Sequence, residues 1–244
     1  MKAIIYVGHG SSVEERNEQF IQFTNQIIKQ VRCLIQEPAF LELATPTITN
    51  AIDTCVEKGA TEITVVPILL LPGIHVSEDI PLEISKGKKQ HPELIINYAK
   101  PLGSDGVIVE MIRNRVVERD VFKELKKAVL LVSHGSRNQQ AVEEFEQLAI
   151  ACKNEISNQY DVYTAYLKMT VPSLEEQLDN LKIYNYQEIY VVPHFLFSGG
   201  FEKEIEEVTQ SYQKQMPNTS IIHCEPTGFD HTLIPLIVKR INQT

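Results

Sequence analysis

The chain has 244 residues, of which 43% are hydrophobic and 23% are charged, a composition typical of globular domains. Its apolar runs are shorter than the roughly 18 residues that a membrane span requires, so we expect no membrane segment. The formal net charge of -9 argues against a nucleic-acid partner, which normally requires a basic face. The N-terminus lacks the pattern of a signal peptide and the four cysteines lack paired spacing, so we expect free thiols and a cytoplasmic location.

Two segments of the first half return in the second half at a nearly constant spacing. Lys2-Ala-Ile-Ile-Tyr-Val-Gly-His-Gly-Ser-Ser12 returns as Ala128-Val-Leu-Leu-Val-Ser-His-Gly-Ser-Arg137, and Val65-Val-Pro-Ile-Leu-Leu-Leu71 returns as Val191-Val-Pro-His-Phe-Leu-Phe197. A constant spacing over this distance indicates a duplicated domain rather than a short solenoid repeat. We therefore predict two domains of ordinary size, 1–119 and 120–244.

Apolar runs and amphipathic periods predict the same order of elements in both copies. In the first copy they predict strands at 2–7, 39–43, 62–70 and 94–99, and helices at 13–35, 47–58, 77–90 and 105–119. In the second copy they predict strands at 128–132, 161–167, 187–193 and 219–224, and helices at 138–157, 173–183, 202–215 and 231–242. Such alternation is typical of parallel sheets covered by helices on both faces. We predict an α/β fold of two tandem flavodoxin-like domains, each with a four-stranded parallel sheet, and a cleft between the lobes.

Three polar residues of the first copy should meet at one edge of its sheet. In the strand order 2-1-3-4, a ligand crevice lies outside the carboxyl ends of strands 1 and 3. His9 ends the first strand between Gly8 and Gly10, Glu42 closes the second strand, and His75 lies in the loop after the third. Two imidazoles and one carboxylate suit Fe, Co, Ni or Zn. We therefore predict a metal site formed by these two histidines and the glutamate.

The second copy serves as an internal comparison for this site. His134 keeps the place of the first imidazole, but Lys168 replaces the carboxylate and Phe201 replaces the second imidazole. An ammonium and a phenyl group cannot replace these ligands, and the ammonium repels a cation. We therefore assign the active site to 1–119 and regard 120–244 as a degenerate copy.

Structural roles for these residues remain open at this point. His9 could bond to the backbone of a tight turn, and Glu42 could be a solvated charge or a helix cap. Ser11 could cap the following helix or offer its N–H group to an anion. A histidine phosphatase would need an arginine where the chain has Gly8, and a serine hydrolase would need a Gly-x-Ser-x-Gly elbow, which neither Ser11 nor Ser136 provides.

Three motifs then point to a known family. They are Val7-Gly-His-Gly-Ser11, Phe40-Leu-Glu-Leu-Ala-Thr-Pro46 and Pro67-Ile-Leu-Leu-Leu-Pro-Gly-Ile-His-Val-Ser-Glu-Asp-Ile-Pro81. With them the chain resembles the class II chelatases, specifically the two-lobed sirohydrochlorin ferrochelatases of bacterial sirohaem synthesis, and the resemblance covers both lobes. The cobaltochelatases of cobalamin synthesis share these motifs. One departure is Ser12, where many relatives have arginine.

The resemblance implies a lyase that inserts Fe²⁺ into sirohydrochlorin without ATP and without a cofactor beyond the substrate metal. It implies that His9 and His75 are metal ligands and proton acceptors, and that Glu42 is an assisting catalytic carboxylate. A cobaltochelatase that uses Co²⁺ and a non-catalytic carrier of metal or tetrapyrrole are the alternatives.

The same resemblance guides the choice of substrate-binding residues and partners. We assign to the substrate-binding surface Gly8, Gly10, Ser11, Gly73 and Ile74. Three apolar residues could either contact the macrocycle or fill the core: Leu69, Leu70 and Leu71. The expected partners are the tetrapyrrole and a divalent metal ion, with no nucleic acid and no membrane. We expect a monomer, with a homodimer as the alternative.

Overall fold

The structure is a computed structural model that describes residues 1–121, 125–156, 158–197 and 199–244. The elements of the first copy are β1 (Lys2–Gly8), α1 (Glu14–Ile28), β2 (Ile35–Phe40), α2 (Ile48–Glu57), β3 (Glu62–Pro67), η1 (His75–Asp79), α3 (Ile80–Gln90), β4 (Ile95–Tyr98) and α4 (Gly106–Arg119). Those of the second copy are β5 (Lys127–Ser133), α5 (Gln139–Glu155), β6 (Tyr160–Tyr166), α6 (Leu174–Lys182), β7 (Glu188–Pro193), α7 (Gly200–Gln215), β8 (Ser220–His223), η2 (His231–Leu233) and α8 (Ile234–Asn242).

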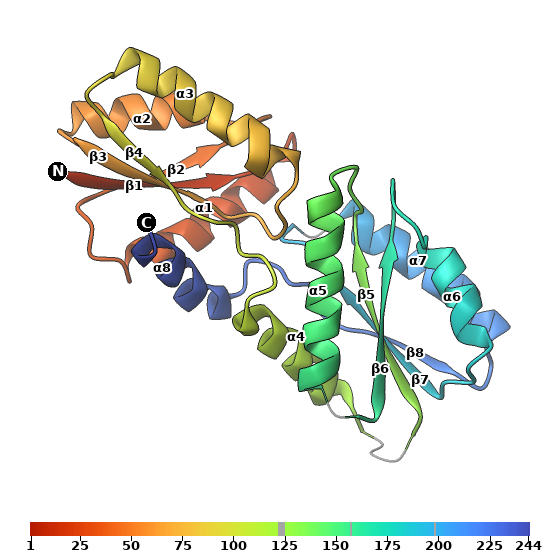
Figure 1. The fold of residues 1–244 in the computed structure, drawn as a ribbon. Coiled ribbons are helices and arrows are strands. Elements are labelled where there is room, and N and C mark those ends of the chain that lie inside the picture. The colour runs from red at the N-terminus through yellow and green to blue at the C-terminus, as the bar shows by residue number, and fades with distance from the viewer. Residues whose placement is uncertain (122–124, 157, 198) are drawn as a thin grey trace. The chain divides into compact units, whose positions relative to one another are not determined.

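Within these described ranges the strands form two parallel sheets of identical topology. Their orders are β2-β1-β3-β4 and β6-β5-β7-β8. The central strands β1 and β5 are apolar and almost wholly buried because helices cover both faces of each sheet. In Figure 1, α2 and α3 cover one face of the first sheet, and α1 and α8 cover the other. The predicted α/β fold and its strand order are therefore confirmed.

The last helix of each repeat packs with the other repeat. One compact unit comprises Met1–Gly103 with Phe229–Thr244, and the other comprises Ser104–Gly228. In the first unit α8 contacts α1 and β3, and in the second unit α4 contacts α5 and β7. The contacts therefore divide the chain differently from the sequence repeat, which predicts 1–119 and 120–244.

Two equivalent arginines attach the last helix of each repeat, α4 and α8, to the unit with which that helix packs. Arg115 of α4 donates to the carbonyl oxygens of residues 225–227, and its bond to the last of these measures 3.0 Å. Arg240 of α8 donates to the carbonyl oxygens of residues 101 and 102 at 3.0 and 2.8 Å. A guanidinium group carries five donors, so one side chain can bind several carbonyl groups of a turn. These bonds join segments about one repeat apart, so the local sequence pattern could not reveal them.

The first helix and second strand differ from their predicted bounds. The predicted helix 13–35 ends at Ile28, and the strand predicted at 39–43 is β2, which runs from Ile35 to Phe40. The segment includes Pro38, which has no N–H to donate, but β2 lies at the edge of the sheet where a proline is tolerated. As a result, Glu42 lies in the loop beyond the strand rather than at its end.

Two further predicted bounds concern helices. The sequence predicts His75 in a loop with a helix from 77, but His75 begins the π-helical segment η1, which continues into α3. The helix predicted at 138–157 is α5, which ends at Glu155, and residue 157 lies outside the described residues.

No helix in the described parts of the chain is long and apolar enough to cross a membrane.

The cysteines occupy the positions expected of small core residues. Cys55, Cys152 and Cys224 are buried, all as free thiols, and Cys33 is partly buried. Burial raises the pKa of Cys55 and Cys152 to about 12 and that of Cys224 to about 11. Thiols with such high pKa values are poor nucleophiles near neutral pH. The three buried cysteines therefore contribute to packing, and the expected free thiols are present in the structure.

A buried histidine follows strand β7 in the second unit. The His194 side chain is hydrogen-bonded through Nδ1 to Thr227 Oγ1 at 2.9 Å, and its ring stacks on Phe145. Burial, with a smaller contribution from the Arg115 charge, lowers the pKa of His194 to about 3. The imidazole is therefore neutral in the folded protein at all but strongly acidic pH.

This histidine should make folding sensitive to acid. An unfolded imidazole protonates near pH 6.5, so below that pH the unfolded state binds a proton that the folded state excludes, down to about pH 3. We expect His194 to lower the free energy of unfolding by about 2 kcal/mol between pH 7 and pH 5. His194→Ile, which copies Ile68 of the first repeat, should remove this loss in urea unfolding at the two pH values. As a control, His231→Asn removes an exposed histidine and should leave the loss of stability between the two pH values as it is in the wild type. An unchanged loss in His194→Ile would contradict the prediction.

Candidate metal centre

The first imidazole follows β1 in a turn that lies against the loop after β2. Leu41 N–H donates to the Gly8 carbonyl at 2.9 Å, and Glu42 N–H donates to the His9 carbonyl at 3.0 Å, so the pairing of β1 with β2 continues past both strands. Gly10 has a φ of +89°, and a Cβ built on it would overlap the carbonyl oxygen of Glu42. Glycine thus permits the close approach that brings His9 and Glu42 together.

The second imidazole is held at the start of η1. The Gly73 carbonyl accepts a hydrogen bond from Val76 N–H at 3.0 Å, and the Tyr98 hydroxyl of β4 donates to the Val76 carbonyl at 2.9 Å. These bonds fix the turn that carries His75. The imidazole itself is hydrogen-bonded through Nδ1 to Asp79 Oδ2 at 2.8 Å.

The structure brings the three predicted ligands together. The Nε2 atoms of His9 and His75 lie 3.2 Å apart, and Glu42 Oε1 lies 3.5 Å from His9 Nε2. All three ligand atoms lie within 4.8 Å of one another, and the two imidazole planes are nearly perpendicular at 89°. The side chains of His9, His75 and Glu42 are 35%, 41% and 48% exposed, so a metal ion can reach them from solvent.

Each imidazole bonds to an oxygen outside the cluster through Nδ1, so both Nε2 atoms face the position where a cation could bind. His9 Nδ1 lies 3.0 Å from the Gly10 carbonyl oxygen, and His75 Nδ1 lies 2.8 Å from the Asp79 carboxylate. Because these oxygens accept hydrogen bonds, each Nδ1 carries the proton and each Nε2 presents its lone pair. Two nitrogen ligands at about 2.1 Å from one ion lie roughly 3.0 to 3.4 Å apart. The observed separation of 3.2 Å fits this geometry.

The equivalent place in the second copy is filled by other side chains. His134 Nδ1 lies 3.2 Å from the Gly135 carbonyl oxygen, as in the first copy. The Phe201 ring lies 4.8 Å from the His134 ring, and Lys168 Nζ forms an ion pair with Glu204 Oε1 at 2.6 Å. Among the described residues of this copy, no group of three metal-binding side chains occurs.

Two of the predicted substrate-binding residues contribute to the turn and its packing. A Cβ at Gly8 would meet the Phe20 ring at 2.9 Å, so glycine allows β1 to pack closely on α1. Ser11 N–H donates to Asn17 Oδ1 at 2.9 Å, and the Ser11 hydroxyl accepts from Val13 N–H at 3.1 Å. The polar groups of Ser11 are therefore hydrogen-bonded within the start of α1.

Exposed apolar residues adjoin the candidate metal ligands in the sequence. Ile74, which precedes His75, is 44% exposed, and Leu43, which follows Glu42, is 65% exposed. Leu70 is buried and Leu69 packs against the core, so these two leucines are mainly core residues. The sequence patterns singled out Ile74 but missed Leu43. The predicted strand 39–43 included Leu43, whereas β2 ends at Phe40.

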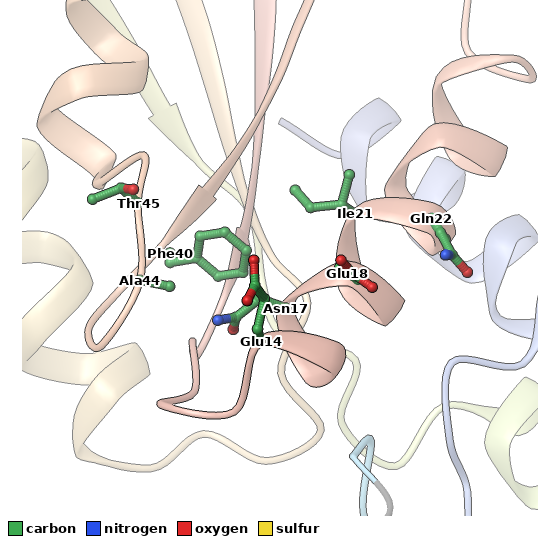
Figure 2. A pocket seen from close by; sticks show the side chains of 8 residues that line it. All are labelled: Glu14, Asn17, Glu18, Ile21, Gln22, Phe40, Ala44 and Thr45. Atoms are coloured by element: carbon green, nitrogen blue, oxygen red, sulfur yellow. The ribbon is translucent and has the colours of Figure 1, made fainter.

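A pocket of about 490 Å³ is lined by residues that are close in sequence to His9 and Glu42. None of the three candidate ligands lines this pocket. Figure 2 shows its lining, which comes from α1, the end of β2 and the loop after it: Glu14, Asn17, Glu18, Ile21, Gln22, Phe40, Ala44 and Thr45. Two carboxylates in this lining disfavour an anionic ligand. The candidate site is therefore the histidine cluster rather than this pocket.

Comparison with known families agrees with the duplication. A family model described as CbiX matches residues 3–119 and again 128–244. The chain belongs to the CbiX family. Both of its repeats match the CbiX model, although the group of described residues that could hold a metal ion lies in the first.

Individual proteins also resemble the chain over most of its length. A sirohydrochlorin ferrochelatase of Priestia megaterium is 38% identical over 207 residues, which cover 85% of this chain and 77% of that protein. A sirohydrochlorin cobaltochelatase of the same organism is 28% identical over 246 residues, covering 100% and 80%. The solved structure of SirB from Bacillus subtilis with Fe³⁺ has a TM-score of 0.91 at 29% identity and covers 99% of this chain and 94% of that one.

The glycines of the two copies allow a matched test of the close approach. Gly10 and Gly135 share a φ of +89°, and a Cβ on either would overlap a carbonyl oxygen, that of Glu42 or Lys168. We expect Gly10→Ala and Gly135→Ala to lower the free energy of unfolding by similar amounts, of order 1 to 3 kcal/mol. Only Gly10→Ala moves His9 away from Glu42, so it alone should weaken Co²⁺ binding, by about tenfold or more. Thermal unfolding and Co²⁺ titration measure both effects, and wild-type Co²⁺ affinity in folded Gly10→Ala would contradict the prediction.

Proposed function

We propose that the chain is a sirohydrochlorin ferrochelatase, a lyase that inserts Fe²⁺ into sirohydrochlorin to form sirohaem. The observation that carries this proposal is the meeting of His9 Nε2, His75 Nε2 and the Glu42 carboxylate in one solvent-accessible cluster. The chain's membership of the CbiX family and its similarity to a sirohydrochlorin ferrochelatase support the same activity.

The reaction requires a dehydrated metal ion and a base for two pyrrole protons. The ring loses two N–H protons as the ion enters, and no electron is transferred. His9 and His75 hold the ion through Nε2, and the same lone pairs accept protons once the ion has moved to the ring nitrogens. Glu42 adds a carboxylate beside His9, which stabilises the bound cation.

The tetrapyrrole needs an apolar surface beside these ligands. Ile74 and Leu43 are exposed next to His75 and Glu42, and they form such a surface for the face of the macrocycle. Gly73 and Gly10 carry no side chain that could block its approach. In this arrangement the ring nitrogens come close to both Nε2 atoms.

A cobaltochelatase is the second candidate function. The chain is similar along its whole length to a sirohydrochlorin cobaltochelatase, and two imidazoles with one carboxylate bind Co²⁺ as readily as Fe²⁺. The donor set alone therefore does not select the metal, and the two functions are separated by relative rates.

Further features follow from the proposed chemistry. The residues of the cluster supply the ligands and the bases, so the reaction needs no cofactor beyond the substrate metal. The free cysteines fit a reducing compartment, and we place the protein in the cytoplasm. Because the cluster is complete within the first copy, a monomer suffices for the activity.

Turnover distinguishes a chelatase from a carrier. With catalytic amounts of protein and excess sirohydrochlorin, we expect many equivalents of metallated product, followed by absorbance under anaerobic conditions. Fe²⁺ and Co²⁺ assayed in parallel should give faster turnover with Fe²⁺. Product that stops at one equivalent of protein would identify a carrier, and faster turnover with Co²⁺ would identify the cobaltochelatase.

The asymmetry between the two copies gives a second test of the site. His9→Ala or His75→Ala should abolish most of the activity because each removes one metal ligand and one base. His134→Ala removes the equivalent imidazole of the second copy and should leave most of it. All three side chains are partly exposed, so each substitution should cost less than the roughly 2 to 5 kcal/mol typical of core truncations. Equal losses of activity from His9→Ala and His134→Ala would contradict a single site.

A further inference from the structure

An aspartate that the metal-binding cluster does not include contacts one of its ligands. In η1 the Ile80 N–H donates to the His75 carbonyl, so this turn is one residue wider than an α-helical turn. Asp79 Oδ2 lies 2.8 Å from His75 Nδ1 across this turn. The carboxylate is therefore bonded to the side of the imidazole opposite the atom that faces His9.

This contact determines which nitrogen of His75 faces the metal position. An imidazole can rotate about its Cβ–Cγ bond and present either nitrogen, and its neutral form can carry the proton on either one. The Asp79 carboxylate accepts a hydrogen bond from Nδ1–H, which selects one orientation and one tautomer. Nε2 then keeps its lone pair, 3.2 Å from His9 Nε2.

The second copy lacks the aspartate as well as the histidine. Phe201 takes the place of His75, and the fully buried Ile205 takes the place of Asp79. The acidic residue just before that position remains, as Glu204. A helix in the same place of the fold thus forms without a carboxylate at this position, and the two polar groups are missing together.

A purely structural role for the aspartate has little support. Asp79 directly precedes α3, where an aspartate commonly caps the helix, but its side chain accepts no capping hydrogen bond from the helix backbone. Its carboxylate is hydrogen-bonded to His75, and both side chains are about two-fifths exposed. An exposed pair of this kind contributes little to folding stability.

We propose that Asp79 is a positioning residue for metal binding, which orients His75 and keeps its Nε2 available as a ligand. This inference rests on the proposed function, because it requires His75 to bind the substrate metal. Outer carboxylates of this kind typically change metal affinity by roughly 10- to 100-fold.

The test uses Co²⁺ alone, without tetrapyrrole, on the full-length protein. Visible absorption of bound Co²⁺ reports its affinity and its ligand geometry. We expect Asp79→Ala to weaken Co²⁺ binding roughly 10- to 100-fold and to alter the spectrum. Asp79→Asn should keep most of the affinity, because an amide oxygen can still accept a hydrogen bond from Nδ1–H. In the His75→Ala background, Asp79→Ala should cause no further loss, because the two residues act through one ligand.

A second histidine–aspartate pair provides the matched control. Asp53 Oδ1 lies 2.7 Å from His91 Nε2, at residues that are not part of the metal cluster. Asp53→Ala should therefore leave Co²⁺ affinity and spectrum unchanged. In steady-state assays Asp79→Ala should raise the KM for the metal and leave the KM for the tetrapyrrole unchanged, with a thermal midpoint close to that of the wild type.

Several results would overturn the proposal. These are wild-type Co²⁺ affinity in Asp79→Ala, an equal loss in Asp79→Ala whether or not His75 is present, and a wild-type protein that shows no saturable Co²⁺ binding. If the wild type binds Co²⁺ through His75 but releases no metallated tetrapyrrole, the proposed function fails, and the Co²⁺ titrations still decide the role of Asp79.

Discussion

The candidate site depends on the close approach of two backbones at Gly10. The carbonyl of Glu42 occupies the space of a Cβ there, and the Glu42 N–H bonds to the His9 carbonyl, so two candidate ligands from the loops after β1 and β2 are fixed to one another. The same approach occurs in the second copy between Gly135 and Lys168. The duplicated fold therefore preserves the turn that presents side chains, while the side chains presented decide whether a metal can bind.

This separation of scaffold from chemistry runs through both halves of the chain. The two sheets have the same strand order, and Arg115 and Arg240 bind equivalent turns through equivalent helices. In the second copy an ion pair and a phenyl ring fill the place of the ligands. A protein that needs a single metal position can lose one ligand set in this way without loss of the fold.

The predictions from sequence were strongest where a feature is local or repeated. The apolar runs of β1 and β5 predicted buried parallel strands, and the strand order then placed His9, Glu42 and His75 at one edge of a sheet, where the structure has them. The polar residues before Phe40 concealed the start of β2, because an edge strand is only half buried and lacks a clear apolar pattern.

The sequence by itself determined the α/β class, the duplication and the residues able to bind a metal, because hydrophobic periodicity, repetition and residue chemistry are written along the chain. Tertiary structure decided which repeat each last helix packs with and which nitrogen of each imidazole faces the metal position. It also decided that His75 and Asp79 meet across a π-helical turn. These features depend on hydrogen bonds and packing between atoms whose positions are set only when distant segments come together, so no local pattern could reveal them.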